Sequence, residues 1–268
     1  MRHTIKVGLL CLLLLGCWSS GSQAQAPVKT IDHTYSAYGS LLNEYVADGL
    51  VDYNRLLPNR SHLDILIDDI ATVNLSSISE NQRLAFYINS YNLITLRSII
   101  DHYPLKSIKD IDGVWDKTKW DVAGKKLTLN QIEHEVLRKE FNEPRIHFAI
   151  VCASIGCPPL SNKPYLPDTI DEQLTNAARL FATSPEYNRF DPEKGTAELS
   201  SIFDWFGDDF IEQFYNKDSF PSLSQKKNAV VNFLIAQYPK ADQEKLSGAT
   251  YDISYNDYDW SLNDKNSK

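Results

Sequence analysis

The segment 79–100, SENQRLAFYINSYNLITLRSII, limits the fold most, because it is apolar on two opposite faces of one helix. A helix apolar on both sides is buried on both sides, so we expect other elements to surround it. Asn89 and Asn92 lie between the two faces, and buried amides need hydrogen-bond partners. The two asparagines predict either a structural polar network or side chains that line a pocket or orient a catalytic group.

The rest of the chain mixes helical periodicity with short strand patterns. There is no Gly/Ser linker and no internal repeat. Further helices are predicted over 33–49, 61–73, 129–140, 168–183, 201–216 and 224–237, and strands over 114–129 (a pair), 145–152, 188–199 (a hairpin) and 251–260. This mixture predicts an α+β fold, a helix-rich single domain around a small, partly antiparallel sheet.

The first 26 residues read as a signal peptide. Arg2 and Lys6 precede the apolar run VGLLCLLLLG, which is too short to span a bilayer as a mature helix. LLGC (14–17) is typical of a lipobox, which would place a lipid on Cys17, whereas SQA (22–24) fits ordinary cleavage. We therefore expect an exported protein, periplasmic or membrane-anchored as a lipoprotein. The predicted organisation is a signal peptide (1–26), a lead-in (27–34), one domain (35–263) and a tail (264–268).

The charge balance excludes some classes of partner. Removal of residues 1–26 takes away two basic side chains and no acidic one, so the net charge falls from −8 to −10. This argues against binding to nucleic acid or to an anionic membrane surface but does not name a partner. We expect an unidentified small-molecule or peptide ligand, and membrane contact only through an N-terminal lipid. The sequence has no Gly-rich phosphate loop and no metal-ligand spacing, so no cofactor is expected.

The helix over 129–140 carries an inward-facing carboxylate. Thr128 and Gln131 match a capping box at its start. Glu133 falls on the apolar face, and His134 lies on its flank. A buried carboxylate is costly unless it is paired or protonated, so Glu133 predicts either a structural ion pair or a catalytic acid or base.

The stretch RIHFAIVCASIGCPPL (145–160) contains both cysteines beyond the leader. Read as a central strand, it places Cys152 at the carboxyl end, where the chain turns. His147 would then lie on the opposite face, roughly 16 Å away at the usual strand rise. We therefore expect His134, or a histidine from elsewhere such as His102, rather than His147 to approach Cys152.

Four interpretations of Cys152 and Cys157 remain open. They are a disulfide, two inert thiols, a thiolate nucleophile at Cys152, and a metal site, the last unsupported by any CxxC or HxxxH pairing.

Several long stretches resemble the uncharacterised bacterial family called domain of unknown function 547. They are GLVDYNRL, LAFYINSYNLITL, LTLNQIEHEVLR, RIHFAIVCASIGCPPL, SIFDWFGDDF and YDWSLN, which follow the family's order over about residues 35–263. The resemblance implies an exported, one-domain architecture and names no chemistry.

Two functions compete, and whether the chain is an enzyme stays open. The first is a thiol-dependent hydrolase or acyl/amide transferase of the cell envelope. Its nucleophile would be Cys152, its base His134, and its orienting group Glu133 or the Asn89–Asn92 pair. Ser154 and the 153–156 amides would form an oxyanion hole.

The second is a non-enzymatic envelope module that binds a ligand or partner and carries a Cys152–Cys157 disulfide. Asn89, Asn92, His147 and Ser154 are candidate binding residues in either case. A redox role is weaker, because the pair lacks the two-residue spacing of thioredoxin-like sites.

Overall fold

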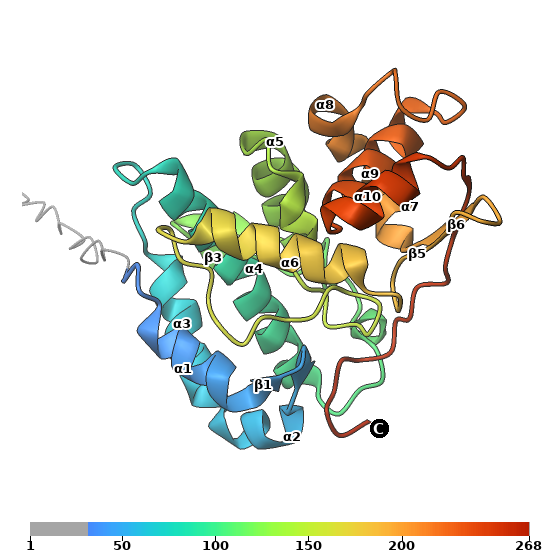
Figure 1. The fold of residues 1–268 in the computed structure, drawn as a ribbon. Coiled ribbons are helices and arrows are strands. Elements are labelled where there is room, and N and C mark those ends of the chain that lie inside the picture. The colour runs from blue at the N-terminus through green and yellow to red at the C-terminus, as the bar shows by residue number, and fades with distance from the viewer. Residues whose placement is uncertain (1–31, 268) are drawn as a thin grey trace, which may run out of the picture.

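Helix α4 (Glu80–His102) runs through the interior of the fold, as the two-faced apolar pattern predicts (Figure 1). Every residue from Leu84 to Ile100 is buried. Ser79 and Gln82 form a capping box that fixes where the helix begins. The computed structural model describes residues 32–267, and in this part of the chain α4 supplies the framework for the elements around it.

The N-terminal half packs around α4. Helix α3 (Arg60–Ala71) lies against α4, and the hairpin of β3 (Trp120–Val122) and β4 (Lys125–Leu127) lies against α3. The remaining elements of this half are α1 (Ser36–Tyr45), β1 (Val46–Ala47), β2 (Leu50–Val51), α2 (Tyr53–Leu56), η1 (Leu57–Asn59), η2 (Ile108–Asp110), η3 (Gln131–Leu137) and α5 (Arg138–Glu140). Thr128 and Gln131 form the predicted capping box ahead of η3, which is wound in wide π turns.

The C-terminal half builds a second, aromatic core. A three-stranded sheet has the order β5 (Arg189–Asp191), β6 (Thr196–Leu199), β7 (Asp252–Tyr255), with β5 antiparallel and β7 parallel to β6. The helices are α6 (Ile170–Thr183), α7 (Ser201–Phe206), η5 (Gly207–Phe210), α8 (Ile211–Phe214), α9 (Gln225–Ala236) and α10 (Lys240–Ser247). The predicted helix over 201–216 is thus three short segments. The fold is mostly helical with small two- and three-stranded sheets, which confirms the predicted class.

The predicted strand over 145–152 is wrong. The segment forms a short 3-10 helix, η4 (Pro144–Phe148), followed by a loop. The amides of Ala149 and Ile150 both donate to the carbonyl of Ile146, so the backbone closes on itself instead of joining a ladder. The residues are apolar throughout because η4 lies between the two cores. Ile146 belongs to the larger core and Phe148 to the aromatic one.

After β7 the chain crosses back to the N-terminal half (Figure 1). Val51 donates its amide to Asn263 and accepts from the amide of Lys265. The carboxylate of Asp264, a residue in the predicted tail, is buried and accepts a hydrogen bond from the Tyr103 hydroxyl at 2.8 Å. Residues 258–264 therefore connect the two halves.

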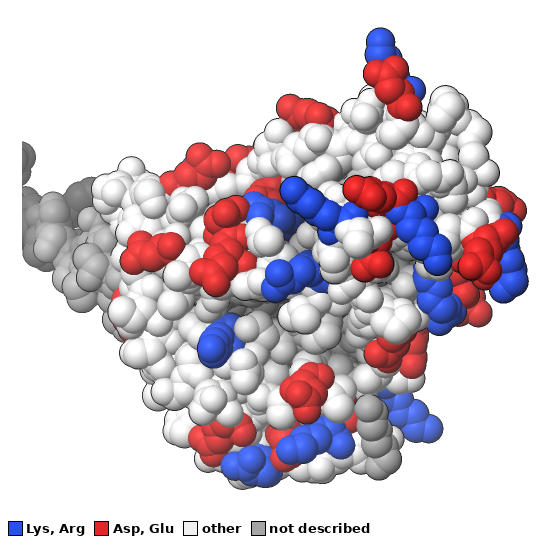
Figure 2. All heavy atoms as spheres, in the orientation of Figure 1, with Lys and Arg blue, Asp and Glu red and all other residues white. Residues whose placement is uncertain are grey.

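The surface carries charges of both signs. Figure 2 shows Lys and Arg side chains interspersed with Asp and Glu on this face, without a large patch of one sign. Among residues 32–267 no helix is long and apolar enough to cross a bilayer. The predicted signal peptide and the lipid site at Cys17 lie outside the described residues.

Candidate functional site

A cavity of about 200 Å³ opens between η3, η4, α7 and the segment 258–260. Its walls combine polar side chains singled out from the sequence with aromatic rings. The former are Cys152, Cys157, Glu133, His134 and His147, and the latter are Tyr91, Trp115, Trp205, Phe206, Tyr258 and Trp260. The cavity is thus the place where the predicted chemistry-bearing residues meet.

The two predicted binding asparagines lie outside this cavity and hold backbone instead. The Asn92 side chain donates to the Ala149 carbonyl and accepts from the Val151 amide, both at 2.8 Å. Asn89 makes the equivalent pair of bonds with the amide and carbonyl of Tyr165. Asn92 therefore fixes the backbone between His147 and Cys152, whereas Asn89 fixes a loop elsewhere.

The cysteines are free thiols in the structure, joined by hydrogen bonds and not by the disulfide considered above. The Cys152 amide donates to Cys157 Sγ at 3.1 Å. The Tyr258 hydroxyl lies 3.2 Å from Cys152 Sγ and 2.9 Å from Cys157 Sγ, so it bridges the two sulfurs. Cys157 is buried, while Cys152 remains partly accessible from the cavity.

The surroundings favour a thiolate at Cys152. A hydrogen bond from Cys157 contributes most to lowering the pKa of Cys152, and bonds from Tyr258 and Ser154 add to it against the opposing effect of burial. Burial raises the pKa of the Cys157 thiol well above its ordinary value, so Cys157 keeps its proton and serves as a donor. The two thiols therefore differ in acidity, and Cys152 has the lower pKa of the pair.

The loop that follows Cys152 is anchored by the C-terminal segment. Ile155 donates its amide to the Ser261 carbonyl and Gly156 donates to the Asp259 carbonyl, both at 2.8 Å. A Cβ at Gly156 would lie 3.0 Å from the Tyr258 ring and from the Asp259 nitrogen, so only glycine fits without displacement. Tyr258 is consequently pressed against the cysteine loop.

These bonds correct the oxyanion-hole prediction. Two of the four predicted donors, the amides of Ile155 and Gly156, are already occupied. The Ser154 amide donates to the Cys157 sulfur, and within residues 32–267 only the Ala153 amide of the four has no hydrogen-bond partner. Ala153 has a φ of 59°, an unusual conformation for a residue with a side chain, directly after Cys152. The Ser154 hydroxyl donates to the Cys152 carbonyl at 3.5 Å and lies 3.8 Å from Cys152 Sγ.

His147 lies in the same cavity as Cys152, contrary to the expectation from a strand. Its Nε2 is 2.7 Å from Asp209 Oδ2 in η5. Its ring stacks on Phe206 with the centroids 4.3 Å apart, and its side chain is 2% exposed. Because Nε2–H donates to the carboxylate, Nδ1 carries the lone pair, and among the described residues it has no hydrogen-bond partner.

Asp209 is itself held by Arg138. The Arg138 guanidinium donates to both carboxylate oxygens, at 2.7 and 2.8 Å. Burial alone would raise the pKa of Asp209, but the bonds from Arg138 and His147 outweigh it and hold the pKa well below its usual range. Asp209 therefore stays ionised and fixes both the tautomer and the orientation of His147.

His134 and Glu133 line the cavity but make different contacts. His134 Nδ1 lies 3.1 Å from Arg138 Nη1, and since a guanidinium only donates, this nitrogen accepts and the proton of a neutral His134 lies on Nε2. Glu133 Oε2 accepts from the Tyr91 hydroxyl at 3.1 Å. His134 is thus less suited to take a proton through either nitrogen than His147 is.

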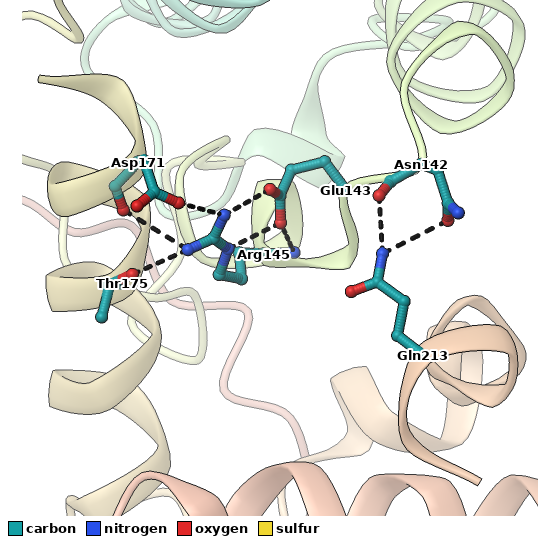
Figure 3. Close-up of polar contacts among 6 residues, drawn as sticks. All are labelled: Asn142, Glu143, Arg145, Asp171, Thr175 and Gln213. Carbon is teal, nitrogen blue, oxygen red and sulfur yellow. Dashed lines mark hydrogen bonds and ion pairs between the residues drawn. The ribbon is translucent and has the colours of Figure 1, made fainter. Parts of the chain in front are cut away.

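A network of polar contacts holds the chain that leads into His147 (Figure 3). Arg145 donates to Glu143, to the Asp171 carboxylate at 2.8 Å and to the Thr175 hydroxyl at 2.7 Å. The Gln213 amide of α8 donates to the Asn142 carbonyl at 2.6 Å. Segment 142–145 is therefore fastened to α6 on one side and to α8 on the other, which fixes where η4 begins.

Sequence reasoning missed several members of the site. They are Asp209, Arg138, Trp205, Phe206, Tyr258 and Trp260. Their only signal was the resemblance itself, since Arg138 ends the stretch LTLNQIEHEVLR and the other five residues lie in SIFDWFGDDF and YDWSLN. Among residues 32–267 no group of three or more His, Cys, Asp or Glu side chains is arranged to hold a metal ion.

Comparison with known proteins adds a family and no chemistry. No curated protein and no solved structure matches the chain. Residues 75–182 match the family described as "Protein of unknown function, DUF547". This range includes α4, η3 and both cysteines of the cavity, while Asp209 and Tyr258 lie beyond it. The chain therefore contains a DUF547 family domain over residues 75–182.

Proposed function

We propose that this chain is an exported enzyme of the cell envelope, a thiol-dependent hydrolase or acyl/amide transferase with Cys152 as its nucleophile. The observation that carries the proposal is the cavity shared by Cys152 and His147, with Asp209 behind His147. A nucleophile, a base and a group that orients the base are the elements of acyl transfer through a covalent intermediate. The N-terminal sequence supports export through Arg2, Lys6 and the apolar run after them.

The reaction follows from the positions of the protons. His147 Nδ1 takes the proton of the Cys152 thiol, and the sulfur attacks the acyl carbon of the substrate, forming a C–S bond. The C–N or C–O bond to the leaving group breaks as the tetrahedral intermediate collapses, and His147 gives its proton to the departing amine or alcohol. Water or an acceptor amine then attacks the thioester with His147 as base, and the thiol is restored.

The charge that develops on the acyl oxygen needs donors near Cys152. The candidate donors are the Ala153 amide, which has no hydrogen-bond partner among residues 32–267, and the Tyr258 hydroxyl, which would have to turn from the Cys157 sulfur toward the acyl oxygen. The free state of both thiols weighs against the disulfide on which the binding-module alternative depends.

The proposal is tested with p-nitrophenyl acetate as a generic acyl donor. We expect a burst of nitrophenolate and an acetyl group on Cys152, detected by mass spectrometry. Cys152→Ala should lose both, and His147→Ala should slow acylation at least about a hundredfold. His62→Ala, which changes an exposed histidine, is the matched control. Acetylation that persists in Cys152→Ala, or equal rates in His147→Ala and His62→Ala, would refute the assignment.

A further inference from the structure

Glu133 places a carboxylate in the wall of the cavity. The residue is only 8% exposed. Its Oε2 accepts from Tyr91, while Oε1 lies 4.0 Å from His134 Nδ1, the nitrogen that already accepts from Arg138. Among residues 32–267 no Lys or Arg lies within direct ion-pair distance of this carboxylate, and Arg138 is near enough that Glu133 contributes to raising the pKa of its guanidinium. A buried carboxylate with an unsatisfied oxygen costs free energy until a donor or a cation meets it.

Aromatic rings line the same cavity. Trp260 stacks on Trp205 and meets Trp115 edge to face, with the centroids 6.0 Å apart in both pairs, and Tyr258 lies 4.6 Å from Trp260. The faces of such rings attract cations. Lys109 Nζ already lies 5.0 Å from the Trp260 centroid, so the cluster accepts an ammonium group on one side.

We propose that the cavity binds its acyl substrate through a protonated primary amine of that substrate, held between the Glu133 carboxylate and the aromatic rings. This inference rests on the proposed function, because it assigns a specificity group to the same site. An ammonium group donates to the free Glu133 oxygen and gains cation–π attraction from the rings, which an uncharged group of equal size does not. The volume of about 200 Å³ limits the bound portion to a short aliphatic amine.

Binding is tested separately from catalysis in the Cys152→Ala protein, with tryptophan fluorescence as the readout. The probes are n-butylamine, protonated at pH 7, and 1-butanol, its uncharged counterpart of similar size. We expect n-butylamine to bind at least about tenfold more tightly than 1-butanol. Glu133→Gln should remove the preference and Glu133→Asp should retain part of it, while the exposed Glu135→Gln should leave it unchanged.

Equal binding of the two probes, absence of binding by both, or a preference that survives in Glu133→Gln would overturn the inference. The comparison of the two probes in the Cys152→Ala protein with Glu133 intact decides the question even if a Glu133 variant fails to fold. Suppose that the Cys152→Ala protein prefers n-butylamine but p-nitrophenyl acetate does not acetylate the wild-type protein. This result would refute the proposed enzyme and leave the amine site standing. Acetylation of the wild-type protein without an ammonium preference would support the proposed enzyme and refute the amine site.

Discussion

His147 Nε2 lies 2.7 Å from Asp209 Oδ2, although 62 positions separate the two residues in the chain. The bond joins η4, between the two cores, to η5 of the C-terminal half. It fixes which imidazole nitrogen is free to accept a proton, so in the proposed mechanism Asp209 acts through His147.

Asp209→Asn should lower the acylation rate with p-nitrophenyl acetate by about a hundredfold or more, because an amide no longer holds His147 in the required tautomer. Asp208→Asn changes the exposed neighbouring carboxylate and should leave the rate unchanged. Stopped-flow measurement of the nitrophenolate burst compares them. A similar small effect in both variants would exclude a positioning role for Asp209.

The stability contributed by Asp209 should depend on pH. Its pKa is depressed by the bonds from Arg138 and His147, so the contribution is fully present above the unfolded-state pKa of about 3.9 and is lost as the pH falls below it toward the folded-state pKa. We expect Asp209→Asn to reduce the free energy of unfolding by about 2 kcal/mol at pH 7. Urea unfolding at several pH values should show the difference shrinking below about pH 4. A pH-independent difference would contradict this account.

Cys152 should react with iodoacetamide at a lower pH than an ordinary thiol. The midpoint of its alkylation profile is expected below 9.0, since hydrogen bonds from Cys157 and Tyr258 stabilise the thiolate. Cys157→Ala should raise the midpoint most, and Tyr258→Phe should raise it as well. Mass spectrometry after timed alkylation gives the profile of each variant, and a midpoint that stays in place in both would show that neither group supports the thiolate.

Asn92 and Asn89 provide a matched pair, because each makes two bonds to backbone groups. Asn92→Ala and Asn89→Ala should each destabilise the fold by about 2–4 kcal/mol. Only Asn92→Ala should also slow alkylation of Cys152, since Asn92 holds the backbone at Ala149 and Val151. Chemical denaturation and alkylation rates measured on both proteins separate the effects. Equal loss of reactivity would mean that Asn92 does not position the cysteine.

Gly156→Ala should disturb the site through one methyl group. The added carbon meets Tyr258 and the Asp259 nitrogen at 3.0 Å, so we expect a loss of about 1–3 kcal/mol and a slower acylation rate. Gly248→Ala meets its nearest atom, Glu244 O, at 3.5 Å and should change little. Thermal unfolding and the nitrophenolate burst provide the comparison, and a fully active Gly156→Ala protein would refute the tight contact.

Local signals in the sequence predicted α4 and the start of η3 well. The capping pairs Ser79–Gln82 and Thr128–Gln131 act within one turn, and the two-faced apolar pattern of α4 needs only burial on both sides. The same reasoning failed at 145–152, because an apolar run between two cores looks like a central strand whether or not a partner strand exists.

The site was less predictable than the helices that support it. Asp209 is one of two adjacent acids, and no spacing rule links it to a histidine so far back in the chain. Tyr258 was expected in a terminal strand, but β7 ends at Tyr255. The segment beyond β7 accepts hydrogen bonds from the amides of Ile155 and Gly156 in the loop 152–157. Pairings of this kind arise from tertiary packing, which single-sequence periodicity does not record.

Because η4 lies between the two cores, the proposed activity depends on contact between the two halves. Cys152 packs with the larger core, Phe206 with the aromatic core, and His147 lies on the segment shared by both. A mild perturbation that separates the halves, while each keeps its helices, would pull the thiol away from the imidazole. The proposed activity would then be lost before any change in circular dichroism, because the site exists only while the two halves are in contact.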